Sequence, residues 1–180
     1  MEPSTLRAPY LSGPSVYLRA PVVGDKEAAA AWLGETFLIN APRAEAMLKE
    51  EYRGPRWPRG GLRLVIVRQE GDAIVGGVRV STHAEFRRCT VELTMAPWEQ
   101  DADALRAEAL RIVVRWLRDE IEAMVVGARL AADQPEAIRA AEETGMIRNG
   151  TLREWFVRPG GRVDVLVYEA LNPRWAVSDA

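Results

Sequence analysis

The stretch RCTVELTMAPWEQDADALRAEALRIVVRWLRDE, from Arg88 to Glu120, decides the fold. Its first part, Arg88 to Ala96, has the composition of a strand, and Pro97 stops it. From Ala102 to Glu120 the apolar residues recur at helical spacing, which predicts one long amphipathic helix. Those apolar residues are Leu105, Ala109, Ile112, Val113, Trp116 and Leu117. The stretch is therefore predicted to be a strand, a short loop and a long helix.

The chain before this stretch predicts short helices followed by a hairpin. A strand at Val16–Arg19 is followed by an alanine-rich helix at 26–33, for which Asp25 is a suitable N-cap. The later elements are a second helix at 42–52, a loop at 53–61, and hairpin strands at 62–68 and 73–82. The helices thus stand between the first strand and the hairpin.

The chain after it returns to strands. Met124–Leu130 is a continuous apolar run, typical of a strand that is buried on both faces. A short helix at 135–144 ends at Gly145, a common residue after a helix. Two last strands, 147–158 and 162–171, are joined by Pro159, Gly160 and Gly161. Strands at both ends with helices between them predict a mixed sheet in an α/β layered domain.

Composition limits the classes of partner and location. The 180 residues suffice for one domain, with residues 1–15 as an arm, 16–175 as the domain and 176–180 as a tail. A formal charge of −2 gives no general case for binding nucleic acid or an anionic membrane. The single cysteine, the lack of a signal peptide and the lack of a long apolar run predict a cytoplasmic protein.

Several motifs have the order and spacing of a known family. They are QPEAIRAAEETGM (134–146), NGTLR (149–153), GGRVD (160–164) with Tyr168, NPRW (172–175), and VYLRAP (16–21) with Asp25. Over about residues 12–175 the chain resembles the GNAT acetyltransferase superfamily, and most closely its branch of ribosomal-protein N-terminal acetyltransferases. The resemblance implies a mixed, mostly antiparallel sheet of about seven strands flanked by about four helices.

The resemblance also implies a reaction, the transfer of an acetyl group from acetyl-CoA to a primary amine of a peptide or small molecule. Attack requires the neutral amine, so a base is expected. Glu92 lies in mid-strand where the family often has that base, and partial burial would raise its pKa. The alternative is an outward-facing strand residue that pairs with Arg79 or Arg88.

The expected donor site follows the strand into the long helix. Main-chain groups of the strand would polarise the thioester, and the helix start would bind the pyrophosphate. The implied residues are Thr94, Met95, Ala96, Ala102, Ala104, Leu105, Arg106 and Gln134. The family's glycines are absent here, and Asp101 and Asp103 would repel a phosphate. Alternatively, these acidic residues only stabilise the helix start.

The remaining candidate residues concern the general acid and contact with the acceptor. Ala137 and Ala141 occupy the positions of the family's proton donors, so the usual general acid is missing. Trp57, His83 and Trp155 are candidates for contact with the acceptor, although a lone histidine is more often a surface residue and an aromatic residue more often part of the core.

One histidine and one cysteine argue against a zinc site. A homodimer is a further expectation from the family. The second hypothesis for function is a GNAT-fold binding or regulatory protein that has lost catalysis, because both the glycine loop and the acid are missing.

Overall fold

The computed structural model describes residues 9–34, 40–51, 61–83 and 87–175. These residues form an eight-stranded sheet in the order β1-β2-β3-β4-β5-β6-β8-β7. Its strands are β1 (Leu11–Ser12), β2 (Val16–Arg19), β3 (Leu62–Arg68), β4 (Ile74–His83), β5 (Arg88–Met95), β6 (Val125–Ala131), β7 (Ile147–Arg158) and β8 (Gly161–Leu171). Only β5 and β6 run parallel among these paired strands, so the predicted mixed, mostly antiparallel sheet is confirmed.

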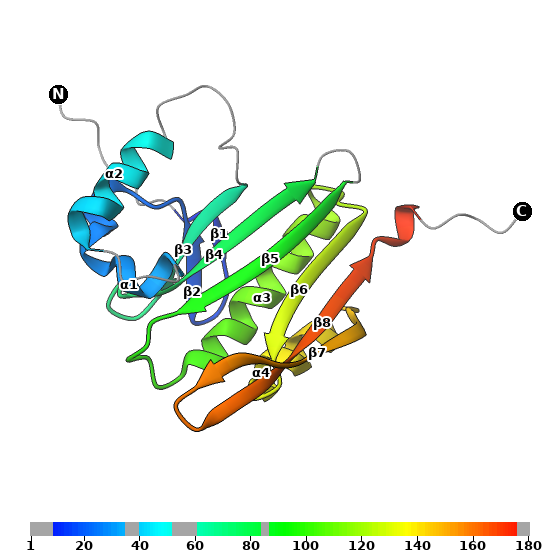
Figure 1. Cartoon of the computed structure of the whole chain (residues 1–180). Helices are drawn as coiled ribbons and strands as arrows, with labels where there is room; N and C mark the ends of the chain where they lie inside the picture. The colour runs from blue at the N-terminus through cyan, green and yellow to red at the C-terminus, as the bar shows by residue number, and fades with distance from the viewer. Residues whose placement is uncertain (1–8, 35–39, 52–60, 84–86, 176–180) are drawn as a thin grey trace, which may run out of the picture.

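Helices cover both faces of the sheet (Figure 1). Four α-helices are found in the described ranges: α1 (Ala29–Trp32), α2 (Ala41–Glu51), α3 (Ala102–Asp119) and α4 (Pro135–Glu143). Short 3₁₀ turns, η1 (Val23–Ala28) and η3 (Pro173–Trp175), precede α1 and follow β8. The helices α3 and α4 lie on one face, and α1 and α2 lie on the other near β3 and β4. None of the described helices is long and apolar enough to cross a membrane.

The core has a part on each face. Against α3 and α4 the strands pack alternate apolar side chains such as Leu18, Ile66 and Val91. The opposite face of β3, with Val65 and Val67, packs against α1 and α2. The long helix buries the apolar stripe that its spacing predicts, so it is fixed against the sheet along its whole length.

The predicted helix at residues 26–33 is only partly helical. Its first half is the 3₁₀ turn η1, and Asp25 lies inside that turn. The Asp25 carboxylate is buried and accepts two hydrogen bonds from Arg19, of 2.7 and 2.8 Å, and one of 2.8 Å from the N–H of Val22. The expected N-cap is therefore wrong, because Asp25 forms an ion pair that ties the turn to β2.

Part of the predicted arm joins the sheet. Leu11 and Ser12 pair with β2. The Glu108 carboxylate of α3 accepts hydrogen bonds from the N–H groups of Ser15, at 2.8 Å, and Val16, at 3.0 Å. The Glu108 contacts tie the turn between β1 and β2 to the long helix.

Candidate functional site

The two edges of β5 differ. Toward β4 the strand forms a continuous antiparallel ladder from His83↔Arg88 to Gly76↔Met95. Toward β6 the parallel ladder ends at Val91↔Ala128, although β5 continues to Met95 and β6 to Ala131. The two strands therefore separate halfway along, and the separation opens at the end where α3 begins.

Alternation along the strand shows which main-chain groups face this opening. The N–H of Ala96 donates to the Val75 oxygen on β4 at 2.8 Å. In an antiparallel pair every second residue bonds the same neighbour, so Thr94 and Glu92 also direct their main-chain groups to β4. Leu93 and Met95 direct theirs toward β6, beyond the end of that ladder.

Three strand residues were predicted to bind the acetyl donor. The main-chain groups of Met95 face the opening, whereas those of Thr94 and Ala96 face β4. Leu93 was missed, because the sequence predicts a strand here but not its register.

The opposite rim is formed by β6 and the start of α4. The N–H of Ala131 donates to the side-chain oxygen Oε1 of Gln134 at 3.1 Å. Gln134 itself is the residue before α4, and its side chain makes no capping bond to that helix. The structure thus places Gln134 beside the opening, bonded to the rim strand.

The start of α3 lies at the same end of the sheet. The first helical bond runs from the N–H of Leu105 to the oxygen of Asp101, at 3.0 Å. The N–H groups of Ala102, Asp103 and Ala104 precede this bond, and helix geometry gives them no partner within the helix. Leu105 has a buried side chain and a bonded N–H, so it offers no donor to a ligand.

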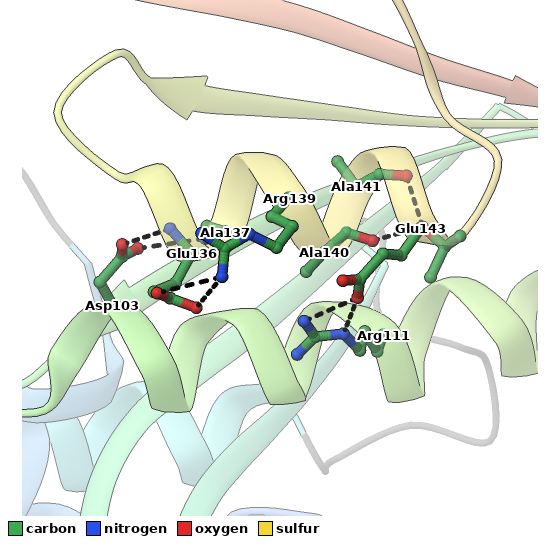
Figure 2. A network of polar contacts seen from close by, with 9 residues as sticks. Asp103, Arg111, Glu136, Ala137, Arg139, Ala140, Ala141 and Glu143 are labelled. Atoms are coloured by element: carbon green, nitrogen blue, oxygen red, sulfur yellow. Dashed lines mark hydrogen bonds and ion pairs between the residues drawn. The ribbon is translucent and has the colours of Figure 1, made fainter.

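The Asp103 carboxylate is used by a different helix (Figure 2). Its Oδ2 accepts from the N–H of Glu136 at 2.8 Å, and its Oδ1 accepts from the N–H of Ala137 at 3.4 Å. Both N–H groups belong to the first turn of α4, so Asp103 fills the N-terminus of α4. The sequence did not predict this contact, in which Asp103 stands in the first turn of α3 and caps α4.

The two helices are joined again further along. Arg111 of α3 donates to Glu143 of α4 at 2.8 Å (Figure 2). Near the first turn, Arg106 lies 3.5 Å from Asp103, and its side chain is only 13% exposed. Burial lowers the pKa of Arg106 and the nearby Asp103 raises it, with burial the larger effect. A guanidinium remains charged at neutral pH after such a change, so Arg106 keeps positive charge near the start of α3.

A second acidic residue before α3 is also paired. The Glu99 carboxylate accepts from Arg68 at 2.7 Å and from the N–H of Asp101 at 3.1 Å. Burial acts to raise the pKa of Glu99, but the hydrogen bonds from Arg68 and the main chain outweigh it and lower the pKa. Asp101 is 69% exposed and lies 3.8 Å from Arg68. Asp101 is thus the acidic side chain of this loop that is most accessible to solvent.

A small polar pocket lies on the other face of β5, beside the opening. Its volume is about 180 Å³, and its lining includes Arg63, Arg79, Glu92 and Thr94 from the sheet and residues 32–34 from the end of α1. Glu92 is 54% exposed and 3.9 Å from Arg79. The expected partial burial of Glu92 is wrong, and the alternative pairing with Arg79 is present. Glu92 nevertheless points into the pocket that adjoins the opening.

Close approach of α1 to the sheet shapes this pocket. Gly34 has φ +59°, and a Cβ there would lie 2.2 Å from the Thr94 hydroxyl oxygen. A Cβ at Gly77 would lie 2.3 Å from the main-chain oxygen of Trp32. Only glycine allows these approaches without displacement, so both glycines define the pocket wall.

The two predicted acceptor residues that the structure describes, His83 and Trp155, do not line the pocket that contains Glu92. His83 pairs with Arg88 at the far end of β5, about 13 Å along the strand from Glu92, and lines a separate pocket of about 230 Å³. Trp155 is 60% exposed on β7, in a bulge between the pairs Leu152↔Val165 and Phe156↔Val163. Trp57 lies outside the described residues.

In the part of the chain that the structure describes, four candidate positions for the proton donor are either apolar or already hydrogen-bonded. Ala137 and Ala141 are fully buried against the core. The Tyr168 hydroxyl donates to Glu142 at 3.0 Å, and burial with this bond raises its pKa. The Tyr17 hydroxyl donates to Asp72 at 3.1 Å. Both hydroxyl protons are therefore committed to carboxylates. Within the described ranges no group of three or more His, Cys, Asp or Glu residues is placed to bind a metal ion.

Comparison with solved structures identifies the family. The crystal structure of a Sphaerobacter thermophilus protein assigned as an acetyltransferase shares 41% sequence identity with a TM-score of 0.72, and the match covers 92% of this chain and 99% of that one. A GNAT-family acetyltransferase from Bacillus anthracis matches with a TM-score of 0.63 over 90% of this chain and 98% of that one, at 12% identity.

The chain belongs to the GNAT acetyltransferases. Other GNAT structures share its fold, including the spermidine/spermine N-acetyltransferase SpeG from Vibrio cholerae, with a TM-score of 0.67 at 16% identity over 89% of this chain and 95% of that one. No protein-family model and no curated protein matches the chain. The comparisons thus support the GNAT fold and acetyltransferase activity as a class.

Proposed function

We propose that this GNAT protein transfers an acetyl group from acetyl-CoA to a primary amine of a small molecule or peptide. The observation that carries the proposal is the incomplete ladder of β5. Leu93 and Met95 direct main-chain groups into the opening, while Glu92 on the same strand projects into the polar pocket. Acetyl-CoA bound in the opening and an amine bound in the pocket would therefore meet at β5.

The residues around the opening suit the donor in most respects. The N–H of Met95 or Leu93 would bind the thioester oxygen, and the N–H groups of residues 102–104 would bind phosphate oxygens. Gln134 lies on the facing rim. Acetyl-CoA supplies an activated acyl group on a thiolate that leaves readily. The fit is better than the sequence suggests, because Asp103 is turned to α4 and Glu99 to Arg68.

Glu92 is the proposed base. An ammonium must lose a proton before its nitrogen can attack, and a carboxylate within reach of the pocket accepts that proton directly or through water. Exposure to solvent gives the proton a route out of the site. The proposed base role of Glu92 depends on its position in the pocket and not on burial of its side chain.

The two positions where the family's proton donors are expected cannot protonate the leaving thiolate, since Ala137 and Ala141 are buried methyl groups. A thiolate is a good leaving group, and after it leaves it takes a proton from water, so the reaction does not require a general acid from the protein. The alternative of a GNAT-fold protein without catalysis is not favoured by the comparisons. Membership in the ribosomal-protein branch, a homodimer and a cytoplasmic location stay predictions.

Calorimetry and a turnover assay test the proposal. Acetyl-CoA is expected to bind, and free thiol is expected to appear when amines are added. Glu92→Gln should lower kcat/KM by about 10²- to 10⁴-fold, and Glu70→Gln, in the exposed β3–β4 turn, is the control. No binding of acetyl-CoA at millimolar concentration would refute the proposal. Unchanged turnover in Glu92→Gln would remove only the base role.

A further inference from the structure

A cluster of charged side chains lies where three elements meet at the open end of the sheet. Arg106 is near the start of α3, Asp133 is in the loop between β6 and α4, and Arg158 is the last residue of β7. The Nε–H of Arg158 donates to Oδ2 of Asp133 at 3.2 Å. Arg158 and Asp133 are both close enough to Arg106 to change its pKa. The three side chains therefore form one cluster.

The sheet register brings Arg158 to this end of the molecule. β6 pairs with β8 as far as Ala131↔Val165, and the β7–β8 hairpin continues beyond that pair to Arg158↔Gly161. The hairpin thus projects past the end of β6, where β6 has already separated from β5 (Figure 1). Arg158 therefore lies at the same end of the sheet as the opening and the start of α3.

Arg106 is a largely buried cation with little compensation. Its side chain is 13% exposed, and its contact with Asp103 is long, at 3.5 Å. The Asp103 carboxylate also accepts two N–H groups of α4. Burial is the largest effect on the pKa of Arg106 and lowers it, and the charge of Arg158 lowers it further, while Asp103 and Asp133 raise it. A partly desolvated cation beside a second cation is stabilised by an added anion.

Both guanidinium groups have N–H donors for such an anion. A guanidinium carries five of them. In the described part of the chain Arg158 uses its Nε–H for Asp133, lies 5.6 Å over the Phe156 ring with its face, and has a side chain 42% exposed.

Arg106 makes one hydrogen bond, to Asp103. The one buried side-chain nitrogen without a partner in the described ranges belongs to Arg19. The remaining nitrogens of Arg106 therefore reach solvent, and one anion can contact both Arg106 and Arg158.

We propose that Arg106 and Arg158 together bind the diphosphate of the acyl donor. This inference rests on the proposed function, in which the N–H groups of residues 102–104, close to Arg106, bind phosphate oxygens. Guanidinium groups bind phosphate oxygens through charge-assisted hydrogen bonds, often two at once. A diphosphate has enough oxygens to contact two guanidinium groups and the main chain. The two arginines then compensate for the absent glycines of the loop before α3 with positive charge from two separate elements.

Calorimetry with two donors tests the assignment. Arg158→Gln should weaken the binding of acetyl-CoA about tenfold, because it removes a charge-assisted contact. Acetyl-dephospho-CoA, which keeps the diphosphate and lacks the 3′-phosphate, should lose the same factor. A loss confined to acetyl-CoA would assign Arg158 to the 3′-phosphate and overturn the proposal. Unchanged affinity for both donors would overturn it as well.

Matched variants distinguish a contact with the donor from a general effect of charge. Arg162→Gln removes an exposed arginine of the same hairpin, which lies 4.0 Å from Glu154, and should leave both affinities unchanged. Arg158→Lys keeps the charge without the planar pair of donors and should recover part of the lost affinity. An equal loss in Arg162→Gln and Arg158→Gln would show that only the overall charge of the hairpin matters, which refutes the contact.

A stability measurement accompanies the titrations. The urea midpoint of Arg158→Gln should equal that of wild type, because its ion pair with Asp133 is exposed on both sides. Arg106→Gln should weaken donor binding at least as much as Arg158→Gln does, but Arg106 is largely buried and its loss also affects folding. Arg158→Gln is therefore the variant that decides the proposal.

The same titrations separate this inference from the proposed function. Binding of acetyl-CoA that depends on Arg158, without release of free thiol when amines are added, supports the diphosphate site and refutes the acetyl transfer. Acetyl transfer with donor binding that is independent of Arg158 refutes the diphosphate site and leaves the transferase in place. Failure of acetyl-CoA to bind at millimolar concentration refutes both.

Discussion

The two edges of β5 have the same sequence and different partners. One edge is paired with β4 along its whole length, and the other is paired with β6 only from Arg88 to Val91. A sheet strand normally satisfies its main-chain groups on both sides. Leu93 and Met95, near the end of β5, therefore keep main-chain donors and acceptors for a ligand, while the complete edge toward β4 holds the strand in place. In this strand, the edge paired with β4 fixes its position, and the edge left open toward β6 can bind a ligand.

The largest expected effect distinguishes these edges directly. Amide hydrogen exchange measured by NMR should be at least about 100-fold faster for Leu93 and Met95 than for Glu92 and Thr94, because only the latter are protected by a complete ladder. Acetyl-CoA should slow Leu93 and Met95 selectively. Equal protection of all four residues in the free protein would mean that the edges do not differ as described.

The sequence predicts most elements and little of their contacts. The apolar spacing of α3 and the run at Met124–Leu130 predict their elements to within about two residues. The pairing Arg63↔Arg79↔Glu92 was not predictable, because register depends on which residues of separate strands align. For the same reason, the sequence could not show that the main-chain groups of Leu93 face the opening.

Longer-range contacts explain the remaining errors. Asp103 and Glu136 are 33 positions apart, so a local interpretation of the acidic helix start could not find the α4 cap. Asp25 was expected to cap a helix because its sequence neighbours favour one, but the buried Arg19 competes for its carboxylate. In both cases a carboxylate near a helix start is bonded to a group from another element.

The second-largest effect is expected at Gly34, which lines the polar pocket that contains Glu92. Gly34→Ala should destabilise the protein by about 2 kcal/mol or more, because alanine is strained at positive φ and its Cβ would displace Thr94. Gly71→Ala is a matched control. Gly71 also has positive φ, +78°, and nothing lies within 4 Å of its added Cβ.

Urea denaturation compares these two variants. Gly71→Ala should cost only the backbone strain, about 1 kcal/mol. The difference between the variants then measures the contact with Thr94. An equal loss in both would contradict the close approach of α1 to β5. The acceptor KM should rise in Gly34→Ala while acetyl-CoA affinity is retained, since the donor edge is on the other side of the strand.

A smaller effect is expected at the junction of α3 and α4. Asp103→Ala leaves the N–H groups of Glu136 and Ala137 without their acceptor and should cost about 1 kcal/mol, as loss of a helix cap does. Asp103→Asn keeps one acceptor oxygen and should cost less. Stability unchanged in Asp103→Ala, measured by the urea midpoint, would show that the carboxylate does not cap α4.

The smallest effect tests whether the start of α3 is the phosphate site. Asp101 is exposed and makes no capping bond, so Asp101→Asn should leave the free energy of unfolding within about 0.5 kcal/mol of wild type. Removing its charge beside the free N–H groups of residues 102–104 should tighten acetyl-CoA binding about threefold at low salt, and less at high salt. Desulfo-CoA, which lacks the thiol, should gain equally, because the effect acts on the phosphates. A gain that is absent at every salt concentration would place the phosphates away from the start of α3.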